Sequence, residues 1–287
     1  MATNRCGDKL KLKKFDMSKV GNNKVLVFIG RRNSGKSCLV LDYLSHNLDI
    51  PVGMVISPTD EFNRTFKGKV PDMFIHSEIT PSILDVFLQR QMKQAKLADT
   101  DKTIDPRAFL ILDDCMADAH AWKNDRTIKF LFMNGRHVYT TLIVTLQDPV
   151  GIPPSLRGNT DYVFICKDTS RQNRKKLYEM YAGMFPTFQL FEDTMLQCCD
   201  NYGCLVVNRS SQSWALEDQV FWYKANMERI KSFKICHPKY WEFNDGFKKK
   251  KQQIEEEKER ENLLKNQRRN GIYTIVRKLD QTMSGEP

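Results

Sequence analysis

The stretch KVLVFIGRRNSGKSCLVLDYL, Lys24–Leu44, joins three kinds of sequence and decides the fold. It begins with a short apolar run, turns through two glycines and continues as an apolar segment long enough for a helix. A short run rich in Val, Leu, Ile and Phe, without polar alternation, is typical of a strand buried on both faces of a parallel sheet. The stretch therefore predicts a strand, a glycine-rich turn and a helix.

The turn matches the motif G-x-x-x-x-G-K-[ST], which holds the phosphates of a nucleotide when it joins a strand to a helix. Its residues, which we expect to surround the phosphates, are Gly30, Arg31, Arg32, Asn33, Ser34, Gly35, Lys36 and Ser37. The glycines let successive backbone N–H groups point inward and form a nest for an anion. Lys36 would reach the β- and γ-phosphates of ATP, and the Ser37 hydroxyl would bind Mg²⁺.

Further apolar runs recur along the chain, separated by helix-like segments. The predicted strands are Lys24–Ile29, Val52–Ile56, Met73–His76, Phe109–Leu112, Thr141–Leu146, Tyr162–Cys166 and Cys204–Asn208. One predicted helix begins after Asp125, a suitable N-cap, and ends at Gly135. This alternation predicts a three-layer α/β/α core with a parallel sheet, the RecA-like P-loop NTPase (ASCE) class, over residues 24–209.

Two carboxylates end one predicted strand, in AFLILDDCM, Ala108–Met116. Ligands of open α/β sheets bind beyond the C-terminal ends of the strands, so Asp113 and Asp114 would emerge beside the phosphates. Asp113 suits the Mg²⁺ shell, and Asp114 would orient or deprotonate the attacking water. The alternative is that the pair caps the following helix.

Gln147 ends the next strand, in TTLIVTLQDP. A neutral amide there can hydrogen-bond both the γ-phosphate and the attacking water. The order Lys36, Asp113–Asp114, Gln147 on successive strands is typical of hydrolysing motor ATPases with an extra strand between the phosphate loop and the acid pair. The sequence has no N-K-x-D guanine signature, so ATP is the expected nucleotide.

Four arginines are candidates for contacts with the transferring phosphate. Arg136 precedes a strand whose far end carries Gln147, and a strand of this length spans roughly 20 Å, so it should not reach its own nucleotide. It would act across a subunit boundary as an arginine finger, which implies a ring of head-to-tail contacts. Arg157 is a second candidate, and either side chain could instead anchor a loop. Arg31 and Arg32 add charge beside the γ-phosphate or face solvent.

The 287-residue chain carries a formal net charge of +10, which favours a polyanionic partner, nucleic acid first. The densest basic patch within the predicted core is Arg171, Arg174, Lys175 and Lys176, a candidate DNA contact or the charged face of an ordinary helix. No run approaches the roughly 18 apolar residues of a membrane helix. We expect no membrane insertion, an intracellular location and free thiols at the eight scattered cysteines.

Composition divides the chain into four expected parts. They are a basic N-terminal arm (1–23), the P-loop core (24–209), an aromatic-rich helical subdomain packed on the core (210–247) and a charged C-terminal helix and tail (248–287). The subdomain rests on the aromatic segments Trp214–Ala225 and His237–Phe247. The segment Lys248–Arg269 predicts a solvated single helix or a tether, and GIYTIVRKL a last short strand.

Several motifs together resemble the genome-packaging ATPases of nucleocytoplasmic large DNA viruses, the poxvirus-type branch of the FtsK/HerA superfamily. They are, in order, GRRNSGKS, VISPTDEFNRTF, FLILDDCM, NGRHVYTTLIVTLQDPVGIPPSLRGNTDYVFI, LYEMYAGMFP and LEDQVFWYKA, and the similarity runs from about Val25 to Ala225. By position, Lys36, Ser37, Asp113 and Gln147 match the residues of the family that hold the phosphates, bind the metal and sense the γ-phosphate, so the resemblance implies these roles for them. It implies an interface role for Arg136. Many superfamily members carry Glu where this chain has the shorter Asp114, so direct or water-mediated contact with the attacking water stays open.

The resemblance implies an oligomeric ring that threads double-stranded DNA into a capsid with ATP and Mg²⁺. Expected partners are DNA without sequence preference, further copies of the chain and a capsid or portal protein. The host cytoplasm (the viral factory) and the virion are the expected locations. Another FtsK/HerA-type pump or helicase, a nucleotide-gated assembly scaffold and a nucleoside or nucleotide kinase are the alternatives. The acid pair argues against the scaffold, and the acid pair followed by Gln147 argues against the kinase.

Overall fold

The computed structural model describes residues 10–115, 124–246 and 260–264. Contacts divide the chain into two units, Met1–His237 and Pro238–Pro287. The first unit contains the whole sheet; in the second, residues 238–246 and 260–264 are helical. The strand predicted near the C-terminus and most of the helix predicted over Lys248–Arg269 lie outside the described residues. The four-part division of the chain stays a prediction.

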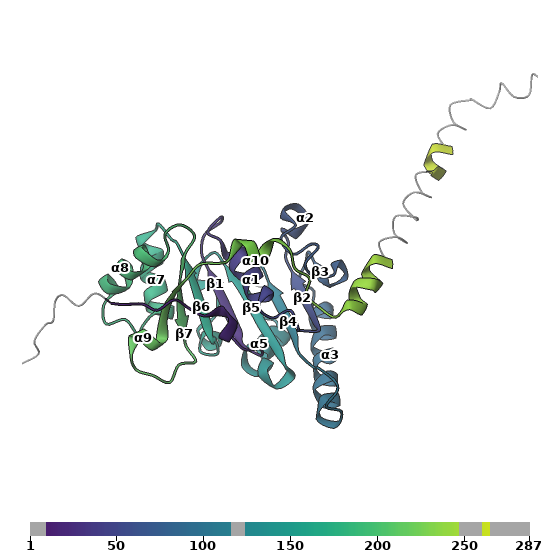
Figure 1. Cartoon of the computed structure of the whole chain (residues 1–287), viewed down its shortest axis with the longest axis horizontal. Helices are drawn as coiled ribbons and strands as arrows, with labels where there is room; N and C mark the ends of the chain where they lie inside the picture. Colours follow the sequence, from purple (N-terminus) through teal and green to yellow (C-terminus); the bar gives the residue numbers. More distant parts are fainter. Residues whose placement is uncertain (1–9, 116–123, 247–259, 265–287) are drawn as a thin grey trace, which may run out of the picture. The chain divides into compact units, whose positions relative to one another are not determined.

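The first unit is built on a sheet with the strand order β3-β2-β4-β5-β1-β6-β7-β8 (Figure 1). Its strands are β1 Val25–Ile29, β2 Val52–Ile56, β3 Ile75–His76, β4 Ala108–Leu112, β5 Thr140–Leu146, β6 Tyr162–Cys166, β7 Cys204–Asn208 and β8 Val220–Tyr223. Strands β1 to β6 pair in parallel. β5 lies between β1 and β4, so an extra strand does separate the phosphate loop from the acid pair, as predicted.

Most helices lie in the connections between the strands, and the direction of each crossover connection determines which face of the sheet its helix covers. The helices are α1 Lys36–Ser45, α2 Asp60–Asn63, α3 Pro81–Thr100, α5 Arg126–Asn134, α6 Pro154–Arg157, α7 Arg171–Tyr181, α8 Phe188–Cys198, α9 Leu216–Gln219 and α10 Met227–Lys231, with 3₁₀ turns η1 Met17–Lys19, η2 Asp72–Phe74, η4 Gly135–Val138 and η5 Pro149–Gly151. The β1–β2 crossover runs one way across the sheet, and the crossovers into β4, β5 and β6 run the other way. Right-handed crossovers therefore place α1 on one face and α3, α5 and α6 on the opposite face. The predicted α/β class and its three layers are confirmed, and the Asp125 side chain caps α5.

One prediction about the sheet is wrong. β7 is antiparallel to β6, with Cys166 directly opposite Cys204. The aromatic segment Trp214–Ala225, part of the expected helical subdomain, contains the short helix α9 and also the strand β8, which is antiparallel to β7. A strand buried on both faces has no sequence pattern that gives its direction, and the aromatic run V-F-W-Y suits a strand at least as well as a helix.

The N-terminal segment lies along the edge strand β8. Trp222 N donates to Lys13 O at 3.2 Å, and Phe15 N donates to Trp222 O at 2.8 Å. The buried Phe15 ring meets, edge-on or tilted, the rings of Tyr162, Phe164, Phe221 and Tyr223. This part of the predicted basic arm therefore covers the edge of the sheet.

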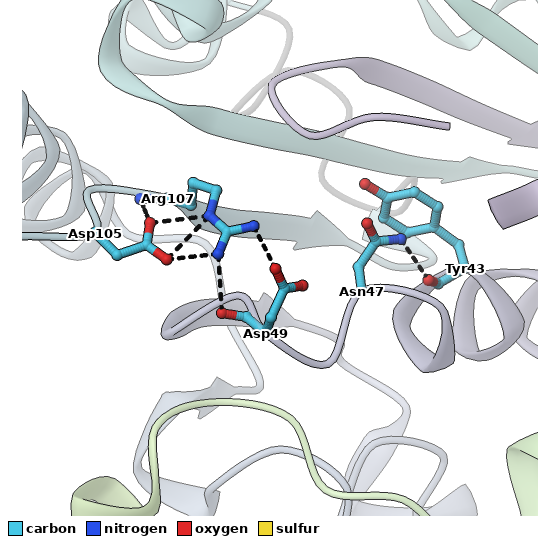
Figure 2. Close-up of polar contacts among 5 residues, drawn as sticks. All are labelled: Tyr43, Asn47, Asp49, Asp105 and Arg107. Atoms are coloured by element: carbon cyan, nitrogen blue, oxygen red, sulfur yellow. Dashed lines mark hydrogen bonds and ion pairs between the residues drawn. The ribbon is translucent and has the colours of Figure 1, made fainter. Parts of the chain in front are cut away.

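A cluster of polar contacts fixes the connection from α1 to β2 against the start of β4 (Figure 2). The Arg107 guanidinium donates to both carboxylate oxygens of Asp105, and to Asp49 Oδ2 at 2.6 Å. The Asn47 amide donates to Tyr43 O at the end of α1 at 2.9 Å. β2 and β4 pair from Val52–Ala108 to Ile56–Leu112, so they also end level with one another, where the candidate site lies.

Candidate active site

The phosphate loop leads from β1 into α1 through two positions that only glycine suits. A Cβ on Gly30 would lie 2.5 Å from Ser34 Oγ and 2.6 Å from Cys166 Cβ, closer than any side chain tolerates. Gly35 has φ +92°, in the left-handed region that glycine adopts without a steric penalty. The loop therefore keeps a tight backbone curl at the N-terminus of α1, where N–H groups and the helix dipole favour an anion.

Lys36 is folded inside this loop. Its Nζ donates to Gly30 O at 2.6 Å and to Arg31 O at 2.9 Å, and only 9% of the residue is exposed. Burial lowers the pKa of Lys36, and the nearby positive charge of Arg32 lowers it further. The hydrogen bonds of the Lys36 ammonium in the described residues go to two backbone carbonyl oxygens, and the group lies beside a nest of N–H groups. It is therefore suited to bind the terminal phosphates of a nucleotide.

Asp113 follows β4 and is held by two hydroxyls. Its Oδ1 accepts from Thr145 Oγ1 at 2.8 Å, and its Oδ2 accepts from Ser57 Oγ at 3.0 Å. Burial raises the pKa of Asp113, although both hydrogen bonds oppose this shift. Sequence reasoning missed both hydroxyls: Ser57 directly follows β2, so the strand-end rule would have found it, and Thr145 is a polar residue inside an apolar run.

Asp114 is turned away from Asp113 by its backbone. Its φ of 52° lies in the left-handed region, and its N–H donates to Thr145 Oγ1 at 2.9 Å. Gln147, the first residue after β5, donates from its amide to Asp114 Oδ1. This conformation costs free energy for any residue other than glycine, and residues that adopt it are concentrated at functional sites. The carboxylate and amide therefore form a polar pair suited to holding a water molecule.

The structure brings the predicted cradle, acid pair and Gln147 to one edge of the sheet. Asp113 and Asp114 lie close enough to Lys36 for their charges to raise its pKa against the effect of burial. The Ser37 hydroxyl and the Asp113 carboxylate supply the oxygen ligands that Mg²⁺ prefers, so the residues present fit Mg²⁺ bound to a nucleotide. The catalytic and binding roles of these residues stay predictions.

Arg136 lies away from that edge, and among the described residues the Arg157 side chain forms no hydrogen bond or ion pair with the cluster. Arg136 belongs to η4, before the start of β5, and is exposed. Arg157 ends α6, with its guanidinium 5.9 Å from the centre of the Tyr181 ring. In the loop itself, Arg31 donates to Thr169 Oγ1 at 2.8 Å and Arg32 is exposed. Arg136 is thus separated from Gln147 by the whole length of β5, about 20 Å.

The basic face of α7 divides into engaged and exposed side chains. Arg174 donates to Glu192 and to Asp168 O, both at 2.9 Å. The Arg171 guanidinium lies 5.8 Å from the Phe188 ring centre. Lys175 and Lys176 are exposed. For Arg174 the structure supports the alternative of an ordinary helix face, and only the two lysines keep their charges free for a partner.

Comparison by sequence connects the chain to large DNA viruses. No protein-family model matches it. It is 39% identical over 242 residues to protein L437 of Acanthamoeba polyphaga mimivirus, covering 82% of this chain and 85% of that protein. It is 36% identical over 230 residues to protein 075L of Invertebrate iridescent virus 6, covering 78% and 85%. The chain belongs to this family of viral proteins. Both relatives are named only as uncharacterized proteins.

Comparison by structure shows the fold that this viral family adopts. The genome packaging NTPase B204 of Sulfolobus turreted icosahedral virus 2, solved with AMP, aligns with a TM-score of 0.51 at 14% identity, over 72% of this chain and 100% of that one. The conjugation coupling protein TcpA aligns with a TM-score of 0.50 at 13% identity, over 71% and 60%. The predicted P-loop fold and the predicted relationship to proteins of large DNA viruses are confirmed. Within the described ranges, no helix has the length and apolar character needed to cross a bilayer.

Proposed function

We propose that the chain is an ATPase that drives double-stranded DNA into a viral capsid. One observation carries the proposal: Lys36, Asp113, Asp114 and Gln147 meet at one edge of the sheet, with the Gln147 amide against the Asp114 carboxylate. A protein that only binds nucleotide needs the loop and a single metal ligand. The second acid and its amide partner support hydrolysis as well.

In the proposed reaction, the loop N–H groups and Lys36 bind the phosphates, and Ser37 and Asp113 hold Mg²⁺. When bound, the ion neutralises charge on the phosphate oxygens. Asp114 accepts a proton from the attacking water, and Gln147 orients that water toward the γ-phosphate. Arg136 or Arg157 of a neighbouring copy stabilises the charge of the transferring phosphoryl group, which requires a head-to-tail ring.

The remaining parts of the proposal concern partners. The net charge of +10 supports binding to DNA phosphates, so DNA affinity should be independent of sequence and fall steeply with salt. A capsid or portal protein would anchor the ring, in the viral factory of the host cytoplasm. Similarity to a packaging NTPase and to a conjugation coupling protein extends only to the fold, so another DNA pump or a helicase of the same superfamily is the main alternative.

A triplex-displacement assay tests translocation directly. Wild-type protein with Mg·ATP should displace a third strand from linear double-stranded DNA, and Lys36→Ala should not. Unwinding of the duplex itself would indicate a helicase. Nucleotide-dependent assembly without displacement or turnover would indicate a scaffold, and brisk turnover that ignores DNA would contradict a motor.

A further inference from the structure

An exposed tyrosine, Tyr202, lies against the phosphate loop. It belongs to the turn between α8 and β7, and 66% of the residue is exposed. A Cβ built on Gly35 would lie 3.7 Å from Tyr202 Cδ1 and 3.9 Å from Tyr202 Cβ, which is ordinary van der Waals contact. The side chain therefore touches the loop while most of its surface stays open.

The turn that carries Tyr202 is held in place. Gly203 N donates to Asp200 O at 2.9 Å, and Asp200 Oδ1 lies 3.2 Å from Nζ of Lys167, the first residue after β6. Asn201 and Tyr202 have φ values of 48° and 60°, in the left-handed region. Asparagine adopts this conformation readily, but a bulky residue adopts it rarely and at a cost in free energy. Residues that bear such a cost are concentrated at functional sites.

The sheet places Tyr202 and the acid pair on opposite sides of the phosphate loop. β5 and β4 lie to one side of β1, and β6 and β7 lie to the other (Figure 1). Asp114 and Gln147 come after β4 and β5. Because β7 is antiparallel to β6, with Cys204 opposite Cys166, the residues before β7 lie at the edge where β6 ends. Tyr202 is therefore at the same edge as the loop, but on the β6 side of it.

This arrangement determines which part of a nucleotide would meet the ring. The proposed function places the terminal phosphate beside Asp114 and Gln147. A triphosphate that runs along the loop from there leaves the nucleoside on the β6 side. The flat face of a purine base stacks well on an aromatic side chain. Tyr202 is thus positioned to meet the base rather than the phosphates.

The polar side chains after β6 are engaged with one another. Asp168 Oδ1 accepts from Ser170 N at 2.8 Å, and its Oδ2 accepts from Asn173 Nδ2 at 3.1 Å. Thr169 Oγ1 accepts from the Arg31 guanidinium at 2.8 Å, which joins this segment to the phosphate loop. Both oxygens of the Asp168 carboxylate are therefore occupied, and contact through the face of the base is favoured over hydrogen bonds to its edge.

We propose that Tyr202 holds the nucleobase of the bound nucleotide by stacking. The triphosphate then lies along the loop between the Tyr202 ring and the acid pair. This inference rests on nucleotide binding in the proposed function, and it assigns a contact to the part of the ligand that Lys36, Ser37 and Asp113 do not reach. Contact with another macromolecule is the less suitable role, because the Tyr202 side chain already touches the loop that holds the nucleotide.

Calorimetric titration of the full chain with two ligands tests the inference. ATP and inorganic tripolyphosphate, each with Mg²⁺, are titrated into wild-type protein, Tyr202→Ala and Tyr202→Phe. Tripolyphosphate has the phosphates but no base, so it reports on the loop alone. Phe62→Ala is the matched control, because Phe62 is an exposed aromatic residue of α2, after β2 and on the acid side of the loop.

The inference predicts that Tyr202→Ala weakens ATP binding by about tenfold or more, the usual effect of removing an aromatic ring that stacks on a base. Its affinity for tripolyphosphate should equal that of wild type, which also shows that the loop remains folded. Tyr202→Phe keeps the ring and should bind both ligands like wild type, as should Phe62→Ala.

Three results would overturn the inference while leaving the proposed function intact. The first is unchanged ATP affinity in Tyr202→Ala beside a wild type that binds ATP. The second is an equal loss of affinity for both ligands, which would mean that Tyr202 supports the loop instead of the base. The third is a loss in Tyr202→Phe as large as in Tyr202→Ala, which would assign the contact to the hydroxyl. A wild type that binds neither ligand would contradict both proposals together.

Discussion

At the scale of single residues, two adjacent aspartates have different surroundings. Asp113 is 3% exposed and accepts hydrogen bonds from two hydroxyls, whereas Asp114 is turned by its positive φ toward the Gln147 amide. The first arrangement suits a fixed metal ligand, and the second suits a base that must reach a water molecule. We therefore expect the two acids to have separate tasks.

Asp114→Asn should lower ATP turnover by a factor of about 100 or more, the usual effect of losing a general base. Nucleotide affinity should change little, because Asp114 does not bind the phosphates. Asp113→Asn is the contrast, since it should weaken the dependence of nucleotide binding on Mg²⁺. Steady-state turnover and equilibrium binding separate the two, and equal effects on both measurements would contradict the assignment.

The affinity for Mg·ATP should fall at both ends of the pH range. The pKa of Asp113 is raised by burial, so its carboxylate is protonated, and metal binding lost, at a pH above the ordinary value of 3.8. The pKa of Lys36 is lowered by burial, so its charge is lost below the ordinary value of 10.5. Titration of the dissociation constant checks this, and Asp113→Asn should abolish the acidic limb.

The raised pKa of Asp113 also determines how this group's contribution to the free energy of unfolding changes with pH. Because folding favours the protonated form of Asp113, this group favours the native state at low pH, and its contribution is lost as pH rises through the raised pKa. Bound Mg²⁺ reverses the preference, since it requires the carboxylate. The metal should therefore stabilise the nucleotide complex more at neutral than at acidic pH.

At the scale of elements, Thr145 joins β5 to the end of β4. It donates to Asp113 Oδ1 and accepts from Asp114 N. Thr145→Val keeps the shape but leaves a backbone N–H unpaired, so the free energy of unfolding should fall by about 1–3 kcal/mol. ATP turnover should fall as well, because Asp113 and Asp114 each lose a hydrogen bond with Thr145.

Thr141→Val is the matched control for that prediction. Thr141 is buried in the same strand, but its Oγ1 accepts from Asn23 N at 2.9 Å, at the opposite end. It should cost similar stability and leave ATP turnover close to wild type. A similar loss of turnover in both variants would mean that Thr145 acts only through stability.

The N-terminal segment is predicted to stabilise the far edge of the sheet. Phe15 is 8% exposed among four aromatic rings, and Phe15→Ala should lower the free energy of unfolding by about 3–5 kcal/mol, as for other large-to-small changes in a core. Chemical denaturation measures the change. Phe62→Ala is the control, because Phe62 is 85% exposed and should change stability little. A stability change below 1 kcal/mol for Phe15→Ala would contradict the packing described.

Much of the site could be predicted from elements alone. Asp113 and Gln147 were found because parallel strands end at one edge, and that rule needs only the strand boundaries. The direction of β7 could not be predicted, because a strand buried on both faces has no sequence pattern that gives its direction. Had β7 been parallel, Arg209, which follows it, would lie at the phosphate-loop edge instead of the opposite edge.

At the scale of the whole molecule, the predicted site residues lie at opposite edges of the sheet. One edge carries the phosphate loop, the acid pair and Gln147, and the other carries Arg136. A single copy cannot bring Arg136 to Gln147, because the length of β5, about 20 Å, separates them. If Arg136 contacts the transferring phosphate as proposed, it must come from a second copy of the chain.

ATP hydrolysis by mixed mutants tests this central claim most directly. Asp114→Asn and Arg136→Ala are each assayed alone, and then mixed, with linear double-stranded DNA at low and moderate salt. Each alone should be nearly inactive, and the mixture should regain part of the DNA-stimulated rate, because some interfaces join an intact acid to an intact arginine. A mixture as inactive as its components, beside a wild type whose turnover is stimulated by DNA, would contradict a site shared between subunits.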